Sequence, residues 1–306
     1  MEPGDVARVE IGECESIHYV DTGMYGVAGY GSVYVIDGPT PAVVDTGLGA
    51  DYDAVRGALD AVGIGPDDLE VIALTHVHLD HAGGAGRLVR DYPNATVFVH
   101  EIGAPHLVDP SRLVEGTKRA VGDQWRHYAE PLAIPEERIT ELTDGDRIGL
   151  GDRALVAHHA PGHAPHQVVF HSAADDAVFT ADAAGIYVPE RDAVEPTSPP
   201  PNFDPEQALA DVETIRALEP SVLCYAHFGP ARTGDRLEEY ERVLGEWVDA
   251  VAEAREAVGG PDGDDEAVIE QFVDAVDTGE VWSDEKAAAE TRMNVRGVLR
   301  ALERSS

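Results

Sequence analysis

The chain has 306 residues, 43% of them hydrophobic and 26% charged, a composition too apolar for a disordered protein. It contains no run of ~20 apolar residues, so it offers no transmembrane helix and no membrane partner. Asp and Glu number 58 against 22 Lys and Arg, a net charge of −36, and such an acidic surface repels the phosphates of nucleic acid.

The first third of the chain alternates strand-like and helix-like segments. Short β-branched runs flank the turn signal Asp37-Gly38-Pro39 and predict a hairpin, and apolar residues at helical spacing follow it. Strands are expected at 32–36, 42–44, 70–75 and 96–100, and helices at 51–62 and 84–91. Residues 101–140 are expected to be helical and rich in loops.

The remainder of the chain changes from a β pattern to a helical one. Strands are expected at 147–150, 154–159, 167–171, 177–180 and 221–226, and helices at 205–217, 236–258 and 284–302. Six prolines between 185 and 205 predict a stiff loop there. This mixture indicates a layered αβ architecture, with a domain at 1–232 and a helical extension at 233–306.

One segment concentrates residues that can bind a metal. His76, His78, Asp80 and His81 fall within six positions, directly after an apolar strand. In an extended segment His76 and His78 point to the same side, because side chains alternate with period two. Imidazole nitrogens suit zinc and other transition metals, and the carboxylate admits zinc, iron or manganese.

This His-x-His-x-Asp-His signature resembles that of the metallo-β-lactamase superfamily. Further motifs match in the expected order, and with them the resemblance spans roughly residues 15–230; they are Val43-Val44-Asp45-Thr46-Gly47, Pro161-Gly162-His163, Thr180-Ala181-Asp182 and Ala226-His227-Phe228-Gly229. The resemblance implies an α+β fold, a four-layer αββα sandwich, here with a C-terminal helical extension. It also implies that Asp45 supports the metal ligands without being one. Within the superfamily, the chain is most similar to a glyoxalase-II-like branch of archaeal and bacterial hydrolases. The residues that carry this similarity are 30–34, 161–166, 200–204 and 226–229.

The resemblance assigns seven ligands, residue by residue, to two Zn²⁺ ions per chain, with iron or manganese as alternative metals. The first ion would be held by His76, His78 and His163, and the second by Asp80, His81 and His227. Asp182 would bridge them. Paired metals ~3.5–4 Å apart generate hydroxide from water near neutral pH and polarise the carbonyl that it attacks.

The resemblance implies a metal-dependent hydrolase that uses a metal-bound hydroxide on an ester, a thioester or a lactone, with a small molecule as its substrate. Asp80 would be catalytic as well as a ligand, because it can orient the hydroxide. The alternative is a mononuclear iron oxidoreductase similar to persulfide dioxygenases. That enzyme would use His78 or His76 together with His163 and Asp182.

Three further side chains are candidates for the surroundings of the metals. His166 follows the motif Pro161-Gly162-His163 and is expected to support a metal ligand or contact the substrate. Tyr187 and Phe203, in the proline-rich segment after Asp182, are expected to line the substrate pocket.

The charge pattern also bears on where the protein works. Lys118 and Lys286 are the only lysines, and an acidic chain this poor in lysine resembles proteins of salt-accumulating halophiles. The acidic N-terminal residues lack the pattern of a signal peptide, and Cys14 and Cys224 form no disulfide framework, so a cytoplasmic location is expected. The helices after residue 232 are expected to pack on the core, cover the pocket rim, or form a homodimer contact.

Overall fold

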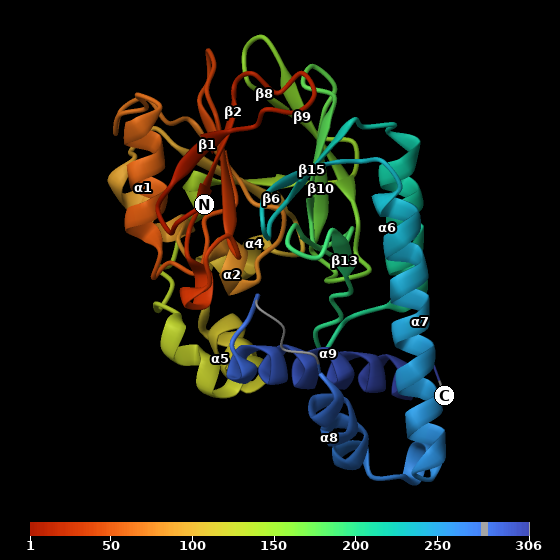
Figure 1. Ribbon diagram of the computed structural model, residues 1–306. Helices are drawn as coiled ribbons and strands as arrows, with labels where there is room; N and C mark the ends of the chain where they lie inside the picture. The colour runs from red at the N-terminus through yellow and green to blue at the C-terminus, as the bar shows by residue number, and fades with distance from the viewer. Residues whose placement is uncertain (277–280, 306) are drawn as a thin grey trace.

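The computed structural model describes residues 1–276 and 281–305, with the backbone alone at 262, and shows two β-sheets packed face to face between helices (Figure 1). The first sheet follows chain order. Its strands are β1 (Val6–Arg8), β2 (Ile17–Asp21), β3 (Ser32–Ile36), β4 (Ala42–Val44), β5 (Val71–Ala73), β6 (Thr96–His100) and β7 (Ile139–Leu142). Strands β1 to β4 pair antiparallel, and β4 to β7 pair parallel with helices in the crossovers.

The second sheet has the order β15-β14-β11-β10-β9-β8. Its strands are β8 (Arg147–Gly149), β9 (Ala154–His159), β10 (Val168–Ser172), β11 (Ala177–Ala181), β14 (Val222–Tyr225) and β15 (Pro230–Arg232). Only β11 and β14 pair parallel, and helix α6 lies in the connection between them. A separate hairpin, β12 (Ile186–Val188) and β13 (Ala193–Glu195), stands beside this sheet.

Helices cover the outer faces and one end of the sandwich. The α-helices are α1 (Tyr52–Ala61), α2 (Leu79–Ala82), α3 (Ala85–Asp91), α4 (Ala104–Val108), α5 (Ser111–Val121), α6 (Pro205–Ala217), α7 (Arg236–Ala257), α8 (Asp265–Ala275) and α9 (Asp284–Arg304). Short 3-10 segments are η1 (Met24–Gly26), η2 (Gly122–His127), η3 (Glu136–Arg138) and η4 (Gly260–Asp262). Among the described helices, none is both long enough and apolar enough to cross a membrane.

Three apolar clusters hold the layers together and confirm the expected αββα sandwich. One lies between the sheets and includes Phe170, Phe179 and the unpaired thiols Cys14 and Cys224. The second packs α1, α3 and α4 on the first sheet, and the third packs α6, α7 and α9 on the second sheet. Strands buried on both faces read as continuous apolar runs, which is why the sequence displays them clearly.

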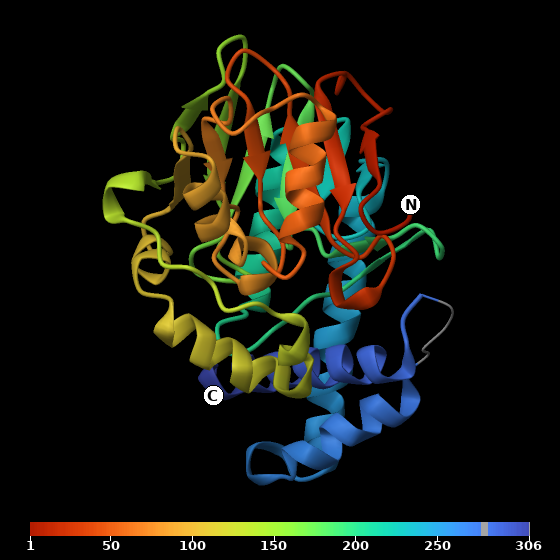
Figure 2. The same ribbon diagram turned by 90° about the vertical axis from the view of Figure 1, so that its left-hand side faces the viewer.

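The third cluster reaches across the expected boundary at residue 232. Leu237, Tyr240 and Leu244 of α7 share it with Val178 and Leu223 of the second sheet. Helix α7 then extends beyond the sandwich, and α8 and α9 return so that α9 lies beneath the sheets beside α5 (Figures 1 and 2). The division into 1–232 and 233–306 stays a prediction.

The proline-rich segment is the place where the sequence prediction of secondary structure was wrong. Residues 185–205 were expected to be a loop throughout, but they contain the β12–β13 hairpin. Prolines lie outside both strands, at 189 and from 196 onward, and Asp192 adopts a positive φ of 49° in the turn. The prolines therefore lie in the turn of the hairpin and after it, where they do not interrupt the hydrogen bonds between its strands.

Candidate metal centre

The His-x-His-x-Asp-His segment leaves the end of β5 and enters a single helical turn. The ring nitrogens His76 Nε2 and His78 Nδ1 lie 3.0 Å apart, as expected for side chains on the same side of an extended chain. Asp80 and His81 follow on the four-residue helix α2 and approach from another direction. The pair His76 and His78 and the pair Asp80 and His81 therefore approach the same region from two directions.

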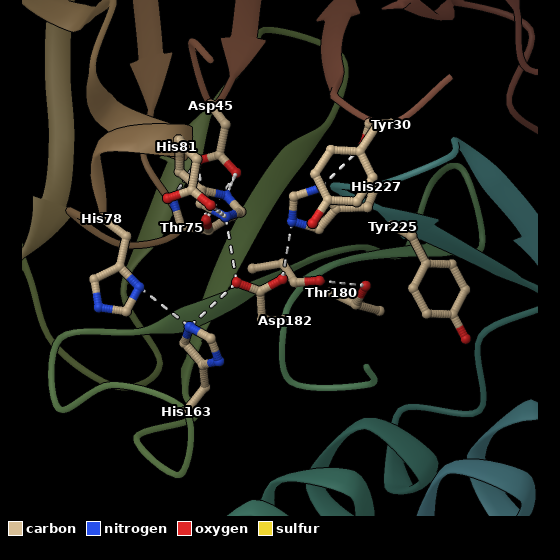
Figure 3. Close-up of polar contacts among 12 residues, drawn as sticks. Tyr30, Asp45, Thr75, His78, His81, His163, Thr180, Asp182, Tyr225 and His227 are labelled. Atoms are coloured by element: carbon tan, nitrogen blue, oxygen red, sulfur yellow. Dashed lines mark hydrogen bonds and ion pairs between the residues drawn. The ribbon is translucent and has the colours of Figure 1, made fainter. Parts of the chain in front are cut away.

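Asp182 lies in that region, one residue after β11 (Figure 3). Its Oδ2 atom is 3.2 Å from Nε2 of His81 and 3.2 Å from Nε2 of His163. The same oxygen is 3.6 Å from Nε2 of His76, whereas Oδ1 faces Nε2 of His227 at 3.4 Å. One carboxylate therefore faces imidazoles on both sides.

All seven predicted ligands gather around Asp182 in overlapping groups whose ligand atoms lie within 4.8 Å of one another. The groups are His76, His78 and His163; His76, His81 and Asp182; and Asp80, His81 and His227. The first and the last group are the two ligand sets expected from the sequence.

The unpaired polar atoms of this cluster test whether a metal fits. His81 Nε2 and Asp182 Oδ1 are buried and have no hydrogen-bond partner, although a buried polar atom left unpaired costs ~1–3 kcal/mol. A cation between these atoms would satisfy both. The five imidazoles and two carboxylates of the cluster form a donor set that suits zinc and admits iron or manganese.

The electrostatics divide the histidines into two kinds. Burial lowers the pKa of His163 to about 3, and it also holds the pKa values of His76 and His78 below the ordinary value. Burial acts on His81 in the same direction, but the carboxylates of Asp182 and Asp80 outweigh it and hold its pKa well above the ordinary value. The first three rings are therefore neutral and ready to donate a lone pair.

Buried hydrogen bonds orient two of the rings. Asp45 accepts hydrogen bonds from the backbone N–H and the hydroxyl of Thr75, and it lies 3.0 Å from Nδ1 of His81. On the other side, Nδ1 of His227 is 3.0 Å from the carbonyl oxygen of Tyr30, whose ring stacks on the imidazole. In both cases the hydrogen bond at Nδ1 turns Nε2 toward Asp182. Asp45 thus contacts a candidate ligand without being one of the group, and Tyr30, which does the same for His227, was not among the predicted site residues.

A cavity of ≈ 360 Å³ opens over these residues. It exposes His78, Asp80, His163, Asp182 and His227 at its floor. Its walls come from η1 and the residues after it, α5, the proline-rich segment at 199–202, and α9.

His166, expected near the metals, lies in the wall of this cavity. Its side chain is almost fully buried, and its ring lies 5.5 Å from that of His78. Its Nδ1 accepts a 3.4 Å hydrogen bond from the backbone N–H of Val77.

Two residues that were predicted to line the pocket do not reach it in the described structure. Phe203 is fully buried in the core beneath α6, because its neighbour Asp204 caps that helix and directs the ring inward. Tyr187 lies on the β12–β13 hairpin, where its hydroxyl bonds to Asp192 and the guanidinium of Arg236 covers its ring at 4.4 Å. With these contacts, Tyr187 is not among the residues that line the cavity.

The structure adds wall residues that were not among the predicted site residues. Tyr25 and Tyr128 share a hydrogen bond between their hydroxyls at the cavity. Helix α9 contributes Lys286, whose ammonium pairs with Glu290 and lies 3.6 Å from the ring centre of Tyr25. The sequence did contain a signal for Lys286. The chain has two lysines, and this one lies in the helical tail, for which no role was assigned.

The fold and this cluster define the class of protein. The profile of the metallo-beta-lactamase superfamily matches residues 26–227, more than half of the chain. The chain therefore belongs to the metallo-beta-lactamase superfamily, and it is a hydrolase of that superfamily.

The chain is similar to individual proteins over part or nearly all of its length. A metallo-beta-lactamase fold-containing protein of Sulfurisphaera tokodaii is 27% identical over 224 residues, which are 71% of this chain and 79% of that protein. A crystal structure of an archaeal superfamily protein from Sulfolobus tokodaii has a TM-score of 0.68 and 23% identity, covering 96% of this chain and 100% of that one. An acyl-coenzyme A thioesterase of Gallus gallus is 32% identical over 154 residues, 46% of this chain and 52% of the thioesterase, so the similarity spans about half of each.

Proposed function

We propose that the protein is a dinuclear zinc hydrolase that cleaves an ester, a thioester or a lactone of a small molecule. The observation that carries this proposal is the position of Asp182, whose two carboxylate oxygens face imidazoles on opposite sides. A carboxylate placed in this way can bridge two cations. A mononuclear site would leave His227 or His81 without a function in the cluster.

The two groups of candidate ligands offer enough donor atoms to hold two metal ions. The first ion would be held by His76, His78 and His163, the second by Asp80, His81 and His227, and Asp182 would be shared. Two such ions, when bound, lower the pKa of a shared water and polarise the carbonyl to be attacked.

Asp80 is the ligand best placed to act on the substrate side. About a quarter of its side chain, 26%, is exposed, and the residue opens on the cavity. Burial raises its pKa, but His81 and His78 outweigh burial and hold the pKa below the ordinary value, so the group is ionised at neutral pH. It can therefore accept a hydrogen bond from the attacking water and fix its orientation.

The size and charge of the protein support a small substrate. A cavity of ≈ 360 Å³ is in the range of small-molecule sites. A net charge of −36 opposes a polynucleotide. The similarity to a thioesterase over about half of its length supports including thioesters among the candidates.

The test is metal analysis of the protein purified in high salt, followed by assays with ester, thioester and lactone substrates. We expect two zinc ions per chain and hydrolysis that a chelator abolishes. His163→Ala should lose metal, and its kcat/KM should fall by more than about a hundredfold. Removing a residue that only hydrogen-bonds to a metal ligand lowers activity about 10- to 100-fold, and removing the ligand itself should lower it further. His171→Ala is the matched control. This histidine is partly buried, and it lies near the C-terminal end of β10, whereas His163 precedes the N-terminal end of that strand.

Full activity after complete removal of metal would contradict the proposal. One iron per chain together with oxygen consumption on a persulfide would replace it with the mononuclear oxidoreductase. In that case His76 or His78, His163 and Asp182 would supply two imidazoles and a carboxylate to the iron.

A further inference from the structure

Helix α5 presents one of its faces to the cavity. The positions that line the cavity recur at intervals of three and four residues, which place them on one side of a helix. They are Arg112, Leu113, Gly116, Thr117, Arg119 and Ala120, together with Val121 at the end of the helix. This face lies near α9, which provides the facing part of the wall (Figure 2).

The two arginines on this face have no acidic partner. Among the described residues, no carboxylate oxygen lies within 4.0 Å of the side-chain nitrogens of Arg112 or Arg119, although the chain has 58 acidic residues. The only polar contact of the Arg119 side chain in this part of the structure is a 3.3 Å hydrogen bond from Nε to the backbone carbonyl of Glu115. Lys118, on the same helix, shows the contrast, because its ammonium pairs with Glu130 at 2.9 Å.

The other charges of the cavity wall are already compensated. Lys286 and Glu290 pair with each other. Asp80 and Asp182 lie among the histidines of the metal centre. Arg112 and Arg119 are therefore the uncompensated charges of the described cavity wall, within a protein whose overall field is strongly negative.

The surface between the arginines is open and apolar. A methyl group added at Gly116 would meet no atom within 4 Å, so the helix leaves room there. Leu113 and Ala120 flank this space, and Met293 of α9 also lines the cavity. A substrate can therefore extend from the metal centre across apolar side chains toward two guanidinium groups.

We propose that Arg112 and Arg119 bind an anionic oxygen group, a carboxylate or a phosphate, on the part of the substrate remote from the bond that is cleaved. This inference rests on the proposed hydrolase function and narrows its substrates to anionic ones. Guanidinium groups bind both kinds of oxyanion through paired hydrogen bonds. The arginines begin ~10 Å apart along the helix axis, a distance that two long side chains can close.

The test compares three p-nitrophenyl esters of equal length that end in a carboxylate, a phosphate or a neutral methyl ester. The zinc-loaded wild type should prefer at least one anionic ester to the neutral one by tenfold or more in kcat/KM, and the preferred group identifies the ligand. In the double variant Arg112→Gln/Arg119→Gln this preference should fall about tenfold, mainly through KM, as expected for the loss of charge-assisted hydrogen bonds.

A single arginine elsewhere serves as the matched control. Arg147 on β8 also has no carboxylate within 4.0 Å among the described residues, and it lies at the opposite end of the molecule from α5 (Figure 1). Arg147→Gln should keep the wild-type preference. Zinc content is measured for every variant, at one salt concentration, so that metal loss is not mistaken for loss of anion binding.

A wild type without preference for an anionic ester, or a double variant with the wild-type preference, would overturn the anion site. Hydrolysis of none of the esters would count against the proposed function instead. The anion site is then tested by calorimetric titration of the zinc-loaded protein with hexyl phosphate and with hexanoate. Binding about tenfold weaker in the double variant supports the site, and equal binding overturns it.

Discussion

At the scale of single residues, the histidines around Asp182 differ in how readily a proton displaces a metal ion. Burial holds the pKa of His163 at about 3, so protons compete for this ring only in strong acid. Asp182 and Asp80 hold the pKa of His81 well above its ordinary value, against the effect of burial. A proton therefore competes with metal at His81 at a higher pH than at His163.

We predict from this difference that zinc leaves in two steps on acidification. The ion held by Asp80, His81 and His227 should be released first, at the higher pH, and the ion held with His163 only at more acidic pH. The measurement is zinc content per chain after dialysis at a series of pH values. Release of both ions in a single step would contradict the assignment.

Asp45 offers a second prediction at this scale. Asp45→Asn should weaken zinc binding about 10- to 100-fold, because an amide nitrogen facing Nδ1 of His81 disturbs the hydrogen bond that orients the ring. The measurement is a competition titration against a chromogenic chelator. Asp51→Asn is the control, since this half-buried carboxyl lies outside the ligand cluster. Wild-type affinity in Asp45→Asn would show that the hydrogen bond does not support the ligand.

At the scale of elements, α9 is fixed to the proline-rich segment by close backbone contact. Asn294 accepts a 2.7 Å hydrogen bond from the backbone N–H of Ser198, and Trp247 donates to the hydroxyl of the same serine. At Gly297 an added Cβ would lie 1.7 Å from the carbonyl oxygen of Ser198. Helix and segment therefore form one wall of the cavity.

Gly297→Ala should destabilise the protein by about 1–3 kcal/mol, because the helix must move away from Ser198. It should also lower activity, since the displaced segment lines the cavity. Gly245→Ala in α7 makes the same exchange inside a helix but meets no atom within 4 Å, so it should stabilise by about 0.5–1 kcal/mol. Denaturant unfolding of both variants gives the comparison, and equal shifts would contradict the close contact.

The same elements show how far the sequence predicts the fold. Strands at 32–36, 42–44, 96–100 and 154–159 and the helix at 205–217 have the predicted bounds, because each is a buried apolar run or a capped amphipathic segment. The ligand cluster was predictable from spaced histidines and ordered motifs. The sequence left open whether the helices after residue 232 pack on the core, cover the pocket rim or form a dimer contact, because the docking of α9 depends on a glycine and an asparagine that contact a segment about a hundred residues earlier.

At the scale of the whole molecule, the net charge of −36 predicts salt-dependent stability. Folding brings like charges together, and the described ion pairs whose partners are both exposed are worth only ~0–1 kcal/mol each. Raising salt from 0.01 M to 1 M shortens the Debye length from ~30 Å to ~3 Å. The melting temperature and the activity should therefore fall when KCl is reduced from molar to tens of millimolar.

Thermal unfolding of the zinc-loaded protein across a KCl series measures this effect. Bound zinc should reduce the salt dependence, because it neutralises ligand carboxylates and favours the folded state. The metal-free protein should accordingly show the steeper dependence. A melting temperature that stays constant over the series would contradict adaptation to high salt and leave the ligand cluster unaffected.

The order of the strands has a consequence for how the protein matures. Neighbours in the first sheet are also neighbours along the chain, so this half can assemble while later residues are still being synthesised. It carries His76, His78, Asp80 and His81, but the remaining ligands at 163, 182 and 227 come from the second half. A nascent chain therefore holds an incomplete set of ligands until both halves have closed on each other. Metal uptake would thus report the completion of folding, and a metal ion held by these residues would join the two halves of the chain.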